Sequence, residues 1–367
     1  MYYLDNLRLS FTFLVILHHV CLTFTGEPGW YYYDKIQDPF TNLVMTLLMT
    51  INRNWVLACF FLISGYFTPG SLDKKGLGIY LKERFLRIGV PLAIFAICIR
   101  PAISYFLRSD TLSFRTYCME GLFLKDIAPG PAWFLEVLLI FSIMYGFCWS
   151  LRKILVTRQP RIRDFPRMRS IFLFISILAC CTFIFRIYFP HQKQIFHLRL
   201  GNYADYVTFF ALGILAYRNK WIDKLTDHIG RQWTIINSIA VMAYALLVIP
   251  AWHAQESLAF LRGGYSLKTF IATYIGTVIA VGSSISLVFL FRTFFNYQPG
   301  IVKSLARDAY AAFIFHAPVL IWVTYVIQSF TLFPFVKFLI VFFAASAVCF
   351  LVCRYVVRNI PYSDRIL

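Results

Sequence analysis

Long apolar runs, separated by short polar and basic segments, set the pattern of this chain. A helix needs about 20 mostly apolar residues to cross a bilayer, whereas strands of a membrane barrel alternate apolar and polar residues over about ten positions. The runs here are continuous, so they predict membrane-spanning helices. Ten spans are predicted, at residues 7–24, 43–67, 88–107, 131–151, 170–189, 203–217, 233–251, 269–291, 308–328 and 333–353.

The second of these spans is unusually long, and Arg53 and Asn54 interrupt it. We therefore expect residues 43–52 to form an interfacial or bent segment, with the span proper beginning at Trp55. No internal repeat, low-complexity tract or long linker marks a second domain. The pattern predicts a single membrane domain over residues 1–367, with no attached soluble domain.

The composition agrees with a membrane location. Of all residues, 59% are hydrophobic and 14% are charged, and the mean hydropathy is +0.67. Soluble domains are about 45–50% apolar and about 25% charged, which excludes a water-soluble globule. The 39 Phe, 22 Tyr and 8 Trp exclude a disordered chain. The nine cysteines form no Cys-x-x-Cys pair, so we expect neither a disulfide framework nor a metal site. The predicted fold class is an all-α polytopic membrane protein.

The basic residues predict the orientation. An even number of spans puts both termini on one side of the membrane. With the N-terminus cytoplasmic, the inner segments hold 23 Lys and Arg and the outer loops hold eight. This bias favours cytoplasmic N- and C-termini in the cell membrane. It also explains most of the net charge of +18, so no nucleic-acid partner is expected. The basic loop 152–169 is typical of an anchor on anionic lipid, and a specific ligand site is the alternative.

An ionisable residue inside a span is a functional candidate, because a charge in the bilayer is costly. Arg8 and His19 are eleven residues apart, which on a helix places them about 20° apart in angle and about 16 Å apart in rise. One face of the first span would then run from a cytoplasmic Arg, beside Asp5, to a mid-membrane imidazole. His18 would face a neighbouring helix. The alternative is that His19 only forms a hydrogen bond to another helix.

His316 is a second buried imidazole, in the ninth span. It lies about nine residues, or roughly 14 Å, from the inner edge, which matches the depth of His19. Pro318 frees a backbone carbonyl and can kink the helix beside His316, or can simply be a packing kink.

Cations gather at the inner end of the third span. Arg84 and Arg87 share one helix face, and Lys74 and Lys75 precede them. Two guanidinium groups form a fork that suits a phosphorylated ligand. The alternative is ordinary enrichment of basic residues on the cytoplasmic side.

At the outer side, Trp133 and Glu136 open the fourth span, and Asp205 lies near the outer end of the sixth. A carboxylate in apolar surroundings needs a partner or a function. Arg53, Arg100 and Arg186 are candidate partners, and ion pairs that only tie helices together would explain them equally well.

Several of these motifs occur together in a known family. The segment Tyr3-Leu4-Asp5-Asn6-Leu7-Arg8, followed by His19 after ten intervening residues, resembles the acyltransferase-3 family of integral membrane acyltransferases. The resemblance continues, in family order and over nearly the whole chain, in residues 60–66, in 84–88 with Pro91, and in 132–135, 209–213 and 309–318. The tyrosine-rich start and the Trp133-Phe134-Leu135 element look closest to the glucan-modifying branch that adds succinyl groups in the periplasm. Ser64-Gly65-Tyr66 is a mild departure, since Ser-Gly-Phe is also frequent.

The resemblance implies an enzyme, an O-acyltransferase. It would move an acyl group, acetyl or succinyl, from cytoplasmic acyl-CoA to a hydroxyl of a glycan or another extracytoplasmic acceptor. Acyl-CoA is then a co-substrate, and no cofactor is tightly bound. The lipid bilayer surrounds the protein, and the resemblance leaves a homodimer open.

The resemblance also suggests roles for the candidate residues. Arg84 and Arg87, with Lys74, Lys75 or Arg8, would hold the CoA phosphates, and His19 would be the general base. His316 would orient the partner of His19, polarise the thioester carbonyl or carry the acyl group. Glu136 and Trp133 would meet the acceptor.

A transporter or flippase for a saccharide-like substrate is the second hypothesis. Mid-membrane His and Glu residues suit proton-coupled transport. The basic inner mouth and the lack of an inverted repeat favour the acyltransferase. A purely structural membrane subunit has only the hydrophobicity in its favour.

Overall fold

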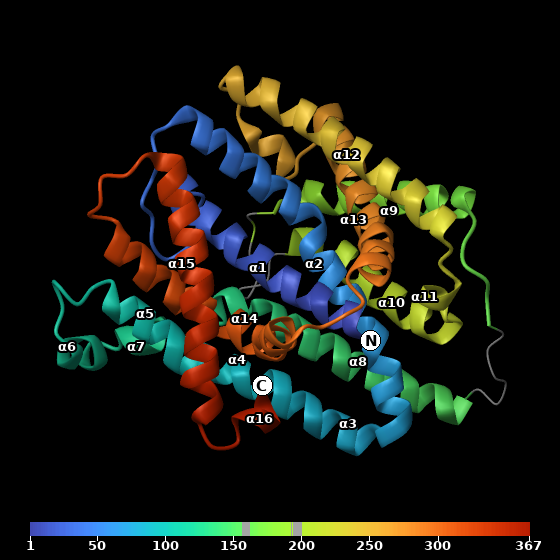
Figure 1. Cartoon of the computed structure of the whole chain (residues 1–367), viewed down its shortest axis with the longest axis horizontal. Coiled ribbons are helices and arrows are strands. Elements are labelled where there is room, and N and C mark those ends of the chain that lie inside the picture. Colours follow the sequence, from blue (N-terminus) through green and yellow to red (C-terminus); the bar gives the residue numbers. More distant parts are fainter. Residues whose placement is uncertain (156–161, 192, 194–199) are drawn as a thin grey trace. The chain divides into compact units, whose positions relative to one another are not determined.

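The computed structural model describes residues 1–155, 162–191, 193 and 200–367. Throughout this described part the regular elements are helices (Figure 1). Nine helices or continuous helical runs among these residues are long and apolar enough to cross a membrane, which confirms an all-α polytopic membrane protein. They are Tyr2–Thr25, Pro39–Lys75, Leu77–Phe106, Leu122–Arg152, Met168–Tyr188, Asp227–His253, Leu267–Phe294, Gly300–Ile327 and Pro334–Asn359.

The remaining predicted span, 203–217, forms helix α10 (Tyr203–Asn219), which has 17 residues. At 1.5 Å per residue it is about 26 Å long, just short of the roughly 30 Å hydrocarbon core. It follows the short 3₁₀ turn η4 (Leu200–Asn202) and ends at Lys220, which has a left-handed φ of 56°. The predicted element therefore exists, but it is short for a span.

Residues 43–52, expected to form an interfacial or bent segment, belong to helix α2 (Pro39–Lys75), which runs unbroken for 37 residues. The interfacial or bent course of this segment stays a prediction. Asn54 donates a hydrogen bond to the Thr50 carbonyl one turn earlier, at 3.0 Å. Gly276 of α13 (Leu267–Phe294) approaches so closely that a Cβ there would lie 2.6 Å from Asn54 Oδ1. The Asn54 side chain is therefore covered by a neighbouring helix.

Contacts within the chain group the described residues into two compact units. The first consists of Met1–Phe11, Leu47–Leu77 and Met144–Val302, and the second of Thr12–Thr46, Gly78–Ile143 and Lys303–Leu367. Residues 156–161, in the basic loop predicted to lie on lipid, are outside the described residues.

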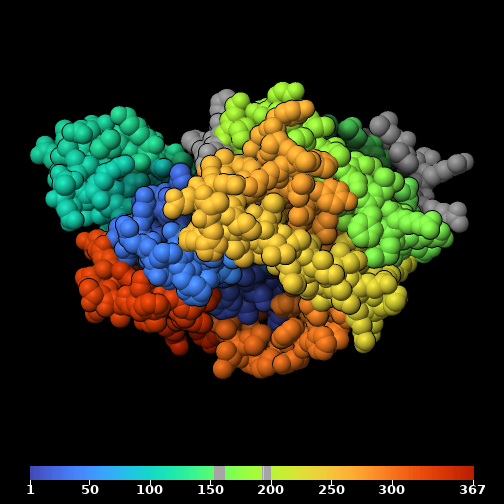
Figure 2. Space-filling view, turned by 90° about the horizontal axis from the view of Figure 1, so that it is seen from above, coloured from blue at the N-terminus to red at the C-terminus, as the bar shows by residue number. Residues whose placement is uncertain are grey.

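The first unit is dominated by the packing of α12 (Asp227–His253) on α13, beside α9 (Met168–Tyr188). Gly282 of α13 allows this approach, because a Cβ there would lie 2.8 Å from Asn237 Oδ1. The opposite side of α12 leaves large apolar side chains exposed at helical spacing, a surface suited to lipid. These are Ile235, Ile239, Met242 and Leu246. Figure 2 shows part of α12, in yellow, at the molecular surface.

The second unit holds most of the candidate site. It contains α1 (Tyr2–Thr25) from Thr12 onward, the loop 26–38, the run Leu77–Phe106 from Gly78 onward, the start of α8 (Trp133–Leu155), α14 (Gly300–Ile327) from Lys303 onward and α15 (Pro334–Tyr355). The short helices α6 (Phe114–Met119), α7 (Leu122–Lys125) and η3 (Gly130–Ala132) connect the third span to α8.

The third span is not a uniform α-helix. It consists of α3 (Leu77–Arg84), the π turn η1 (Phe85–Gly89), α4 (Val90–Ile94), a second π turn η2 (Phe95–Ile99) and α5 (Arg100–Phe106). The N–H groups of Val90 and Arg100 each donate five residues back, to Phe85 and Phe95. Pro91 and Pro101 follow these turns, and a proline ring clashes with the carbonyl four residues earlier. The wider turns accommodate that clash, and π turns are frequent at functional sites.

Gly276→Ala tests the close approach of α13 to Asn54. The added Cβ would overlap Asn54 Oδ1, so we expect a loss of about 1–3 kcal/mol in stability, measured as a lower Tm in detergent. Gly78→Ala is the matched control, because a Cβ at Gly78 meets no atom within 4 Å. That variant should be neutral or slightly stabilised. Equal Tm values for the two variants would contradict the packing.

Candidate active site

The structure brings the two predicted imidazoles together. His19 lies six residues before the end of α1, and His316 lies in the middle of α14. Their ring centroids are 4.7 Å apart, with an interplanar angle of 48°. His316 is buried, with 2% of its surface exposed, and His19 is half-buried. The similar depth predicted for the two residues is therefore matched by a direct ring contact.

Backbone carbonyls fix the tautomer of both rings. His19 Nδ1 lies 2.8 Å from the Val15 carbonyl, and His316 Nδ1 lies 2.6 Å from the Phe313 carbonyl. A carbonyl only accepts hydrogen bonds, so Nδ1 carries the proton in each neutral ring. Nε2 then holds a lone pair, and it is the atom with which a histidine acts as a general base. His316 Nε2 is buried and has no hydrogen-bond partner.

Trp30 forms a wall of this site. Its ring lies 4.5 Å from that of His19, and 7% of its surface is exposed. The loop that carries it is tied back to the end of α1 by the N–H groups of Asp34 and Ile36. The Asp34 carboxylate also pairs with buried Lys337 at 2.7 Å. Trp30 was not predicted. The aromatic run 30–33, directly after the span that holds His19, is the signal that points to it.

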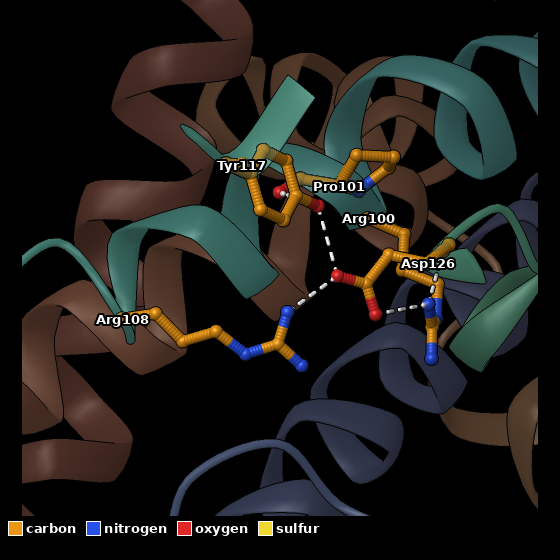
Figure 3. Close-up of polar contacts among 5 residues, drawn as sticks. All are labelled: Arg100, Pro101, Arg108, Tyr117 and Asp126. Carbon is orange, nitrogen blue, oxygen red and sulfur yellow. Dashed lines mark hydrogen bonds and ion pairs between the residues drawn. The ribbon is translucent and has the colours of Figure 1, made fainter. Parts of the chain in front are cut away.

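Asp126 holds together the connection between the third span and α8 (Figure 3). Arg108 pairs with its carboxylate at 2.6 Å, and Tyr117 donates a hydrogen bond to it at 2.8 Å. Arg100 donates to the Asp126 backbone carbonyl and lies 3.5 Å from the carboxylate. Burial, together with the bond to Asp126, raises the pKa of Tyr117 to about 12. One buried carboxylate thus joins α5, α6 and the segment after α7.

Arg100 connects the Asp126 cluster to the aromatic wall formed by Trp30 and Tyr31. Its guanidinium lies 5.9 Å from the centre of the Tyr31 ring. Tyr31 packs against Trp30 at 5.4 Å and against the backbone of Gly130. A Cβ at Gly130 would lie 2.0 Å from the Tyr31 hydroxyl, and Gly130 has a φ of +48°, so both space and conformation call for glycine there. The contacts thus run from Asp126 through Arg100, Tyr31 and Trp30 to His19.

Trp133 and Glu136 lie in the first turn of α8. One carboxylate oxygen of Glu136 is buried. Between the two, Phe134 packs edge-on against Phe313 of α14 at 5.8 Å, three residues before His316. The predicted acceptor-binding segment is therefore anchored on the helix that carries His316.

At the other end of the third span, Arg84 stacks over Tyr80, with 5.0 Å from its guanidinium carbon to the ring centre. Tyr310 of α14 donates a hydrogen bond to the backbone carbonyl of Arg87. Arg84 is half-buried and Arg87 is exposed. The turn that carries the two predicted phosphate-binding residues therefore contacts α14.

The other predicted cations lie in the first unit. Arg8 is 3.6 Å from the Asp5 carboxylate and 4.4 Å from the centre of the Phe67 ring. Lys74 and Lys75 are exposed at the end of α2. Their part in the site remains a prediction.

The remaining buried charges form ion pairs. Arg186 pairs with Asp205 at 3.5 Å, and Thr182 donates to the same carboxylate. Arg100 pairs with Asp126, which the sequence had not singled out. Among the described residues, no group of three or more His, Cys, Asp or Glu side chains could hold a metal ion.

Comparison with known proteins gives the family. The family model described as an acyltransferase domain matches residues 1–354. The chain belongs to the acyltransferase-3 family.

Curated relatives named "Glucans biosynthesis protein C" match as well. Those of Shigella dysenteriae serotype 1 (strain Sd197), Escherichia coli strain K12 and Escherichia coli strain SMS-3-5 are each 26% identical over 258 residues. The match covers 67% of this chain and 65% of each relative. No solved structure matches the chain. Both the family and the likeness to its glucan branch agree with the expectation from the motifs.

Within the second unit, the family elements that are distant in sequence meet in the structure. The opening motif supplies His19, the element 309–318 supplies His316, and the segments around Arg84 and Trp133 pack along α14. In this acyltransferase-3 protein, α14 is therefore the common support of the candidate site.

Asp126→Asn tests the cluster that supports the aromatic wall. Arg100 and Arg108 would lose their shared carboxylate, so we expect stability to fall by about 2–4 kcal/mol, at the lower end because Arg108 is half exposed. The Tm in detergent measures this loss. Asp110→Asn, at an exposed position of the same connection, should leave the Tm unchanged. A wild-type Tm for Asp126→Asn would exclude the cluster as a support.

Proposed function

We propose that this protein is a membrane O-acyltransferase with His19 as its general base. It moves an acetyl or succinyl group from cytoplasmic acyl-CoA to a hydroxyl of a glycan or another extracytoplasmic acceptor. The observation that carries the proposal is the pair of packed imidazoles, each with its Nδ1 at hydrogen-bonding distance from a backbone carbonyl, which makes Nε2 the basic nitrogen. This is a proton-accepting arrangement in a chain that belongs to an acyltransferase family.

The reaction follows from this arrangement. His19 Nε2 takes the proton of the acceptor hydroxyl while the oxygen attacks the thioester carbonyl. The tetrahedral intermediate then collapses, the C–S bond breaks, and the proton held by His19 passes to the leaving CoA thiolate. An ester and free CoA result, and the base is regenerated.

The hydrogen bond at Nδ1 limits which of the suggested roles suit His316. Neutral His316 uses its only N–H on the Phe313 carbonyl, so it has no donor left to polarise a thioester carbonyl. Its free Nε2 can instead accept a hydrogen bond from His19 once that ring is protonated. We assign His316 this role, in which it stabilises the His19 imidazolium during the reaction.

At the donor end, Arg84 and Arg87 would bind the CoA phosphates, with Lys74, Lys75 and Arg8 adding positive charge. The hydrogen bond from Tyr310 to the Arg87 carbonyl, which joins this turn to the helix of His316, supports this assignment. At the acceptor end, Trp133 and Glu136 would contact the sugar. The name of the relatives supports a glucan acceptor. Donor binding from the cytoplasm requires the orientation predicted from the basic residues, with both termini inside the cell membrane.

His19→Ala tests the base. We expect acyl transfer by protein purified in nanodiscs to fall about 10²- to 10⁴-fold, because the hydroxyl would lose its proton acceptor. His253→Ala, at the exposed end of α12, is the matched control and should retain full activity. Retained activity in a folded His19→Ala variant would remove His19 from the mechanism.

Arg84→Ala tests the donor site separately. Loss of a charge-assisted phosphate contact should raise the KM for acyl-CoA about 10- to 100-fold. Binding of CoA to the wild type is measured in the same nanodiscs. A folded wild type that binds no acyl-CoA would overturn the proposal and favour a transporter.

A further inference from the structure

Tyr310 has no role in the reaction above, yet it contacts the donor site directly. Its hydroxyl donates a hydrogen bond to the backbone carbonyl of Arg87. The bond joins α14 to the π turn η1, which Arg84 precedes and in which Arg87 lies. It is made by a side chain to a main-chain atom, so it acts on the position of the backbone that carries these cations.

Pro91 explains why this carbonyl needs a side-chain donor. In an α-helix, the carbonyl of Arg87 would accept the N–H of the residue four positions later, and that residue is Pro91. Proline has no N–H, so the regular bond cannot form. The Arg87 carbonyl therefore lacks its regular helical partner. The Tyr310 hydroxyl takes the place of that partner.

The same bond links the two ends of the candidate site. Tyr310 and His316 are six residues apart on α14, which corresponds to about 9 Å of rise. The backbone of Arg87 is therefore fixed to the helix that carries His316. Donor phosphates bound by Arg84 and Arg87 would then be held at a set distance from the imidazole pair.

We propose that Tyr310 is a positioning residue for acyl-CoA, which holds the Arg84–Arg87 turn against α14 by donating to the carbonyl that Pro91 leaves free. The proposal rests on the proposed function, in which these two arginines bind the CoA phosphates. It assigns the Tyr310 hydroxyl to donor binding and gives it no part in proton transfer.

The test is CoA binding and acyl-transfer kinetics of purified protein in nanodiscs. Tyr310→Phe should weaken CoA binding and raise the KM for acyl-CoA about three- to tenfold, the usual effect of one lost hydrogen bond. The kcat should stay within about twofold, because the imidazole pair is intact. Tyr325→Phe, on the same helix, is the matched control and should bind CoA like the wild type.

A second substitution separates positioning against α14 from mere satisfaction of the carbonyl. Pro91→Ala restores an N–H four residues after Arg87 but does not tie the turn to α14, so the variant carrying both Pro91→Ala and Tyr310→Phe should bind CoA no better than Tyr310→Phe alone. Pro101→Ala in the same background acts on the other π turn and is the matched control. Wild-type CoA binding by Tyr310→Phe, or recovery of CoA binding with Pro91→Ala, would overturn the proposal.

Arg84→Ala and Arg87→Ala distinguish a failure of the positioning role of Tyr310 from a failure of the proposed donor site. If neither arginine variant weakens CoA binding, the donor assignment itself is wrong. If both weaken binding and Tyr310→Phe does not, only the positioning role is lost.

Discussion

Hydrocarbon offers no water, so every polar atom at membrane depth has to find its partner in the protein itself. The imidazole pair shows the consequence most directly. His19 and His316 each commit Nδ1 to a carbonyl of their own helix, at Val15 and Phe313. In each neutral ring, Nε2 is then the nitrogen that holds the basic lone pair. The constraint that makes buried polar groups costly therefore also selects the tautomer that a general base requires.

The same constraint shapes the third span. Its two prolines withhold N–H groups, the helix widens into π turns before each, and the carbonyl of Arg87 obtains its donor from Tyr310 of another helix. Near the C-terminal end of this span, Asp126 gathers Arg100, Arg108 and Tyr117, so that its buried carboxylate is paired. Local irregularities of one helix thus become fixed contacts between helices, and these contacts hold the candidate site together.

Much of the site could be predicted from the sequence because its main signals are local. Helical periodicity placed Arg8 and His19 on one face, and counting residues from the inner edge gave His316 the same depth. Trp30 and Asp126 could not be found in this way. Trp30 reaches His19 through a loop, and Asp126 follows a four-residue helix, so neither belongs to a periodic pattern. The packing of Asn54 could not be predicted either, because a glycine of a helix distant in sequence, Gly276, covers this polar side chain.

The sequence by itself determined the membrane class, the helical fold, the family and the residue types available for chemistry, since hydropathy and motif spacing are properties of the linear chain. Only the tertiary structure decided which side chains meet. The contacts between His19 and His316, between Tyr310 and Arg87, and between Arg100 and Tyr31 join segments far apart in the chain. Such contacts depend on how helices pack, and helix packing is set by side-chain shape at interfaces that no periodicity within one segment encodes.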